Sequence, residues 1–134
     1  MLRKTIWGAA FIGSALLIQP AAGQTVLAPR EAHEQARTGR LLLVDIRAAP
    51  EWADGGVPLG AVRLDAGSAG FEVRLAGLRL DNAGKRIALI DRTGGLSASV
   101  QQQLAQRGWR DLAIVSGGML GPGGWLAEKL PVEQ

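Results

Sequence analysis

The sequence contains no cysteine, and this absence excludes more chemistry than any other feature of its composition. Without thiols there is no disulfide framework, so the fold must be stabilised by packing alone. A thiol nucleophile and a thiolate metal ligand are excluded for the same reason. Histidine is almost as scarce, because His33 is the only one. His33 lies among charged neighbours in a segment that supplies no catalytic partner, so we expect it to be exposed to solvent.

The chain also lacks any run of lysine or arginine. Its 134 residues carry a formal charge of +3, and this falls to +1 once residues 1–23, with Arg3 and Lys4 and no acid, are set aside. A nearly neutral domain without a basic cluster argues against nucleic acid as a partner.

Residues 1–23 have the composition of a secretory signal peptide. Two basic residues precede an apolar segment, residues 6–18, which is too short to span a bilayer comfortably. Small residues follow, so we expect cleavage before Gln24 and one exported domain over residues 24–134, which would be periplasmic in a Gram-negative cell. No contact with the membrane is expected after cleavage. The alternative is a leader retained as an N-terminal anchor.

Short apolar runs alternate with segments of helix-forming composition in the remaining chain. Strands are expected over residues 41–45, 61–64, 86–90 and 112–115. Helices are expected over residues 29–37, 71–80, 96–107 and 125–130. This alternation predicts an α/β domain with parallel strands, right-handed crossovers and helices on both faces of the sheet.

The segment from Arg86 to Ser97 combines a buried strand, a glycine turn and the start of a helix. Ile87–Ile90 are apolar, as in a strand buried on both faces, and the pair Gly94-Gly95 permits the positive φ angles of a sharp turn. Backbone N–H groups at such a turn, together with the helix dipole, form an anion site. Asp91 stands at the tip of the strand, where an open α/β fold places its chemistry. A carboxylate there repels an external anion.

Two groups of motifs occur in a fixed order along the chain. The first runs through Leu43-Val44-Asp45-Ile46-Arg47 and Glu51-Trp52 to Val57-Pro58-Leu59-Gly60-Ala61. The second comprises Ile87 to Ser97, then Gly108-Trp109 to Gly117-Gly118, and Trp125. Together they resemble the motifs of a single-domain rhodanese. The resemblance implies a small, rhodanese-like α/β domain with a mostly parallel central sheet. It also implies that active relatives are sulfurtransferases, in which a cysteine at the strand tip takes up a sulfane sulfur.

On this resemblance the nucleophile position of the family matches Asp91, and the arginine that usually precedes a serine matches Leu96. Gly94 and Ser97 agree with the family. The active-site-like loop comprises Asp91, Arg92, Thr93, Gly94, Gly95, Leu96 and Ser97. Because a carboxylate cannot carry a persulfide, sulfur transfer by the family mechanism is excluded, and no catalytic residue, metal or cofactor is expected.

We interpret Asp91 as an internal anion whose carboxylate accepts N–H groups between Thr93 and Gly95. It would then fill the nest that a donor anion occupies in active relatives. The Asp-x-Arg motif formed by Asp45 and Arg47 implies a structural hydrogen bond. Trp52, Trp109 and Trp125 are interpreted as packing residues.

These observations favour a binding or regulatory module, connected to sulfur metabolism by its resemblance, whose partner is a protein of the exported compartment or a small anion. The expected binding surface is the rim around residues 91–97, with the loops at residues 55–60 and 118–124 beside it. Two alternatives remain open. One is a hydrolase or phosphatase with Asp91 as nucleophile. The other is a binder of small sulfur oxyanions, with Arg92 as the charge partner.

Overall fold

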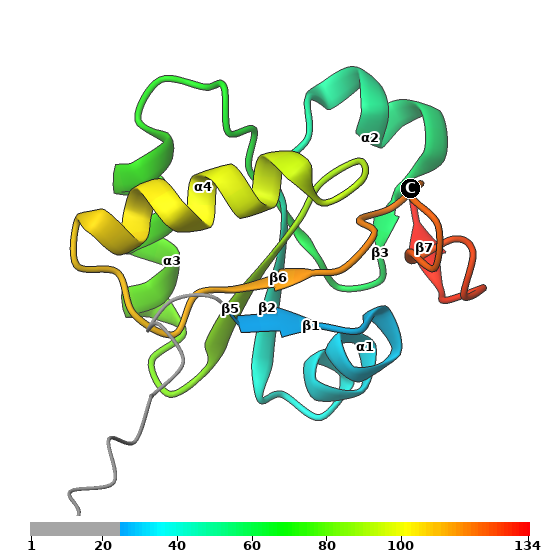
Figure 1. Ribbon diagram of the computed structural model, residues 1–134, viewed down its shortest axis with the longest axis horizontal. Helices are drawn as coiled ribbons and strands as arrows, with labels where there is room; N and C mark the ends of the chain where they lie inside the picture. The colour runs from blue at the N-terminus through cyan, green and yellow to red at the C-terminus, as the bar shows by residue number, and fades with distance from the viewer. Residues whose placement is uncertain (1–24) are drawn as a thin grey trace, which may run out of the picture.

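The computed structural model describes residues 25–134, so the predicted leader and its cleavage site before Gln24 lie outside the described residues. Five strands form one fully parallel sheet in the order β1-β6-β5-β2-β4 (Figure 1). These strands are β1 (Thr25–Leu27), β2 (Leu41–Asp45), β4 (Val62–Arg63), β5 (Arg86–Ile90) and β6 (Ala113–Val115). The helices are α1 (Pro29–Arg37), α2 (Ala49–Gly55), α3 (Phe71–Asp81) and α4 (Gly95–Gln106). The predicted α/β architecture with a mostly parallel central sheet is confirmed.

The central strand β5 divides the hydrophobic core into two halves because successive side chains point to opposite faces of a sheet. Ala88 and Ile90 belong to one core cluster, which also includes Ala32 of α1. Ile87 and Leu89 belong to the other, which is closed by α3 and α4. Figure 1 shows α1 on one side of the sheet and α3 with α4 on the other. Helices therefore cover both faces, as the alternation of elements predicts.

The C-terminal part of the chain differs from the expected helix over residues 125–130. The chain passes there through successive turns and then forms β7 (Val132–Glu133), which pairs antiparallel with β3 (Val57–Pro58). Trp125 is fully buried, and its indole N–H donates to the carbonyl of Pro131 at 2.9 Å. Because the segment is so short and is fixed at both ends, the hydrogen bonds of a helix would not offset the cost of nucleating it. The same pairing makes part of the predicted loop at residues 55–60 a short strand.

The end of β2 is held by a buried ion pair between Asp45 and Arg47, which are 0% and 4% exposed. The Nε and Nη2 atoms of Arg47 lie 3.0 and 2.8 Å from the Asp45 carboxylate oxygens. Arg47 also donates to the carbonyl of Gly56 at 2.7 Å, and the indole N–H of Trp52 donates to Asp45 at 3.2 Å. The pair thus joins the end of β2 to the middle of α2 through Trp52 and to its C-cap through Gly56. Within residues 25–134, no helix is long and apolar enough to span a bilayer.

Replacing Arg47 by methionine is expected to destabilise the domain by about 3–5 kcal/mol, because it leaves the Asp45 carboxylate buried without a counter-charge. The double variant Asp45→Asn/Arg47→Met should be more stable than Arg47→Met alone, since it removes the unpaired charge. Urea unfolding measures both changes. Arg37→Met, which breaks the exposed pair with Glu34, is the matched control and should change stability little. Equal stability of Arg47→Met and the wild type would contradict a structural role for the pair.

Candidate functional site

The Asp91 side chain turns back into the loop that follows β5, and the residue is only 2% exposed. One carboxylate oxygen accepts the backbone N–H of Gly94 at 2.6 Å, and the other accepts that of Ser97 at 3.0 Å. Gly94 is the N-cap of α4 with a φ of +106°, and it has no side chain with which to cap the helix. Asp91 therefore supplies the acceptor that an N-cap side chain usually provides. Its negative charge also interacts favourably with the positive end of the helix dipole.

The donors to Asp91 extend further along the chain than the expected range from Thr93 to Gly95. Gly94 lies within that range, whereas Ser97 lies beyond it, at the third position of α4. Because the third N–H of a helix has no partner inside the helix, it is free to bond an acceptor placed before the first turn. Ser97 itself is completely buried, and among the described residues its hydroxyl oxygen has no hydrogen-bond partner.

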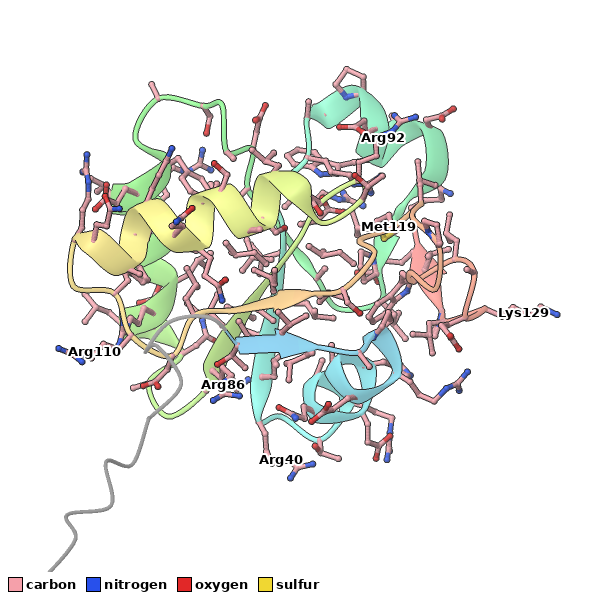
Figure 2. All side chains as sticks on the ribbon, viewed as in Figure 1. Arg40, Arg86, Arg92, Arg110, Met119 and Lys129 are labelled. Carbon is pink, nitrogen blue, oxygen red and sulfur yellow. The ribbon has the colours of Figure 1, made fainter. Side chains whose placement is uncertain are left out.

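A second loop, residues 117–124, is joined to the Asp91 loop through the backbone. The N–H of Met119 donates to the carbonyl of Asp91, and the N–H of Leu120 donates to that of Arg92, both at 2.8 Å. Gly118 makes this approach possible because a Cβ atom there would lie 2.6 Å from the carbonyl oxygen of Asp91. Figure 2 shows Arg92 and Met119 at the same end of the domain.

The outer surface of the loop is formed by its exposed residues, whereas the Asp91 carboxylate is buried beneath them. Arg92 is exposed, and its guanidinium lies 3.5 Å from the carboxylate of Glu51 on α2. Thr93 and Gly95 are also exposed, and Leu96 is 48% exposed. The loop therefore presents one cation and one apolar side chain to solvent, whereas its own anion faces inward. The sequence did not point to Glu51 as the partner of Arg92.

Asp45 lies at the same edge of the sheet as Asp91, since it is in register with Ile90 on the neighbouring strand. Its two oxygens are already bonded by Arg47 and Trp52. The two carboxylates are thus separately satisfied, one by a cation and the other by backbone N–H groups. Neither is arranged as the partner of the other in acid–base chemistry.

His33 is not fully exposed, contrary to the expectation. It is half-buried, and its ring packs edge-on against Trp125 with centroids 5.7 Å apart and planes at 89°. The contact arises because the C-terminal segment folds over α1, which the local sequence around His33 does not reveal. Trp125 is a core residue, as expected, and Trp109 packs at the edge of the core that α3 and α4 cover.

Replacing Asp91 by alanine is expected to lower the free energy of unfolding by about 2–4 kcal/mol, because two backbone N–H groups lose a charged acceptor. Formate, which has the chemistry of the missing carboxylate, should raise the melting temperature of this variant more than that of the wild type. Sulfate should have a similar but weaker effect. Thermal unfolding in formate, sulfate and chloride at equal ionic strength measures the difference.

The matched control is Asp65→Ala, because Asp65 also accepts one loop N–H, that of Gly67 at 2.7 Å. The melting temperature of Asp65→Ala should be the same in formate as in chloride. If Asp91→Ala has the same melting temperature as the wild type in all three salts, the capping role of Asp91 is contradicted.

Gly118→Ala is expected to destabilise the domain strongly, since its Cβ would meet the Asp91 backbone at a φ of +56°. Gly123→Ala is the matched control, because Gly123 has a similar φ of +65° but open space around it. Chemical unfolding should show the larger loss for Gly118→Ala. Equal losses would mean that backbone conformation alone, and not the approach of the two loops, accounts for the effect.

Comparison with known proteins agrees with this geometry. The family model described as "Rhodanese-like domain" matches residues 28–121. No curated protein matches the chain. Among solved structures, Rv0390 from M. tuberculosis is 27% identical, with a TM-score of 0.63, and the match covers 82% of this chain and 97% of that chain.

Two further structures show the shared fold alone. A rhodanese-related protein from Thermoplasma volcanium is 21% identical, with a TM-score of 0.64, over 81% of this chain and 97% of that chain. A single domain sulfurtransferase from Saccharomyces cerevisiae is 18% identical, with a TM-score of 0.57, over 82% of this chain and 94% of that chain. Because the family model matches more than half of the sequence, and the parallel sheet, its helices and the loop after β5 have the expected arrangement, the chain belongs to the family of rhodanese-like domains.

Proposed function

We propose that this rhodanese-like domain is an exported binding or regulatory module that does not transfer sulfur. The observation that supports the proposal best is the buried carboxylate of Asp91, which accepts the N–H groups of Gly94 and Ser97 inside its own loop. By the sequence resemblance, Asp91 stands where active relatives carry their cysteine. The chain has no cysteine at any position, so no side chain is available to hold a persulfide.

The filled loop also argues against an external anion as the ligand of this site. Two N–H groups that would bind a donor anion are already bonded to Asp91. Leu96 stands at the position that resembles the family's arginine, so a cation that would attract such a donor is missing there. A sulfur oxyanion would have to displace the Asp91 carboxylate. The carboxylate has the advantage because it is covalently part of the loop and is therefore always present at a high effective concentration.

A hydrolase or phosphatase with Asp91 as nucleophile has less support. A nucleophile must reach its substrate, and both Asp91 oxygens are turned inward and hydrogen-bonded. Within residues 25–134 there is no group of three or more His, Cys, Asp or Glu side chains arranged to hold a metal ion. We therefore assign Asp91 to the interior of the loop.

The outward face of the same loop has the chemistry of a recognition surface. Arg92 supplies an exposed cation, and Leu96 and Leu120 supply apolar side chains that are 48% and 49% exposed. The N–H of Leu120 donates to the carbonyl of Arg92, so the two loops that carry these residues lie side by side. Arginine beside exposed leucines suits a protein partner with an acidic group next to an apolar one.

The site of action is inferred from the leader. Residues 1–23 have the composition of a signal peptide, so we propose that the partner lies in the exported compartment, the periplasm of a Gram-negative cell. A partner there is connected to sulfur metabolism through the family to which this domain belongs.

The test is capture of a partner from an extract of the exported compartment, with the chain purified after export as bait. A stoichiometric partner should bind the wild type, and Arg92→Glu should reduce its recovery by about tenfold, because a rim charge is reversed. Arg30→Glu is the matched control, since Arg30 is equally exposed but pairs with Glu128 elsewhere on the surface.

Three outcomes would overturn the proposal. The first is a folded bait that retains no partner. The second is a partner retained equally by Arg92→Glu and the wild type. The third is saturable binding of thiosulfate by the wild type at low concentration, which would favour the small-anion alternative.

A further inference from the structure

A groove of about 690 Å³ opens at the end of the sheet opposite the Asp91 loop. Ile87 lies near the start of β5 and lines this groove, whereas Asp91 follows the end of the same strand. The other walls come from the end of α3, the turn before β5 and the segment before β6. The groove is therefore separate from the site described above, and the proposed recognition surface does not use it.

The floor of the groove is apolar, and one of its apolar wall residues is exposed to solvent. Leu80, Ile87, Trp109 and Leu112 contribute to its lining. Leu80 is 81% exposed, although it stands beside this apolar surface. A cavity of this volume with a mostly apolar lining has the size and character of sites that hold small organic molecules.

Among residues 25–134, the lining of the groove includes one acid, Asp111, and the four cations Arg79, Lys85, Arg86 and Arg110. None of the four cations takes part in the ion pairs found among residues 25–134. The residues that line the groove thus carry a formal charge of +3, although the chain after its leader carries only +1. Figure 2 shows Arg86 and Arg110 at an edge of the domain far from Arg92.

One of these cations is already held in place against the aromatic wall. The guanidinium carbon of Arg79 lies 5.2 Å from the centroid of the Trp109 ring. Such stacking leaves the edge of the guanidinium free to donate to an anion, while the ring offers a flat apolar surface beside it. The wall therefore combines a preorganised cation with a surface for a planar group.

We propose that this groove binds a small organic anion with a planar apolar body and one acidic group, such as an aromatic sulfonate or carboxylate. The body lies on Trp109 and Leu80, and the acidic group pairs with the guanidinium groups of Arg86 and Arg110 at the rim, which form no ion pair with any residue from 25 to 134. Burial of the body supplies most of the affinity. Charge-assisted hydrogen bonds to arginine select an anion over a neutral molecule of the same shape.

The probe for this test is 8-anilinonaphthalene-1-sulfonate, titrated into the folded chain purified after export and followed by fluorescence. One molecule should bind per chain, with energy transfer from tryptophan. Its neutral analogue N-phenyl-1-naphthylamine has the same rings without the sulfonate and should bind about tenfold more weakly or worse. Arg86→Gln/Arg110→Gln should weaken sulfonate binding about tenfold and leave binding of the neutral analogue almost unchanged.

The control is Arg30→Gln/Arg37→Gln, which removes two exposed cations that do not line the groove and should leave both affinities unchanged. Melting temperatures establish that every variant is folded, because loosely packed proteins also bind this dye. Equal affinity for the two probes, or equal sulfonate binding by the Arg86/Arg110 variant and the wild type, would overturn the proposal. So would sedimentation of the chain with phosphatidylglycerol vesicles that is lost in that variant, because the basic edge would then be a membrane-binding surface.

Discussion

The structure around the predicted site depends on one interaction, the capture of two backbone N–H groups by the carboxylate of Asp91. This contact joins the end of the central strand to the first turn of α4, whose N-cap, Gly94, has no side chain. The carbonyl of Asp91 in turn accepts the N–H of Met119, so the second loop is attached to the same residue. A charged acceptor inside the loop therefore takes the place of an external ligand in ordering it.

This arrangement separates the interior of the loop from its exterior. In the interior the Asp91 carboxylate is buried and hydrogen-bonded, and the Ser97 hydroxyl has no partner among residues 25–134. The exterior, with Arg92 and Leu96, remains available for contact. A family that normally conducts chemistry inside the loop is thus compatible here with recognition outside it, since the fold does not itself determine the function. The opposite end of β5 carries a second surface of different chemistry, the basic groove beside Trp109.

Much of the fold could be predicted because its elements have strong local signals. Four consecutive apolar residues, Ile87–Ile90, require burial on both faces of a sheet, and Pro29 and Gly39 mark the limits of α1. The composition of residues 125–130 permits a helix, but no helix forms there. The conformation of this segment is instead set by the pairing of β7 with β3, residues that are far apart in sequence.

The sequence by itself determined the buried strands, the main helices and which chemistry is impossible, because these depend on residue types and on their spacing along the chain. The absence of cysteine excludes a persulfide in any conformation. Only the tertiary structure decided that Ser97 is a donor to Asp91, that His33 packs on Trp125, and that four cations gather around one groove. The last two arise from segments distant in sequence, and all three depend on how the turns and crossovers of the sheet orient their elements, which a local pattern does not specify.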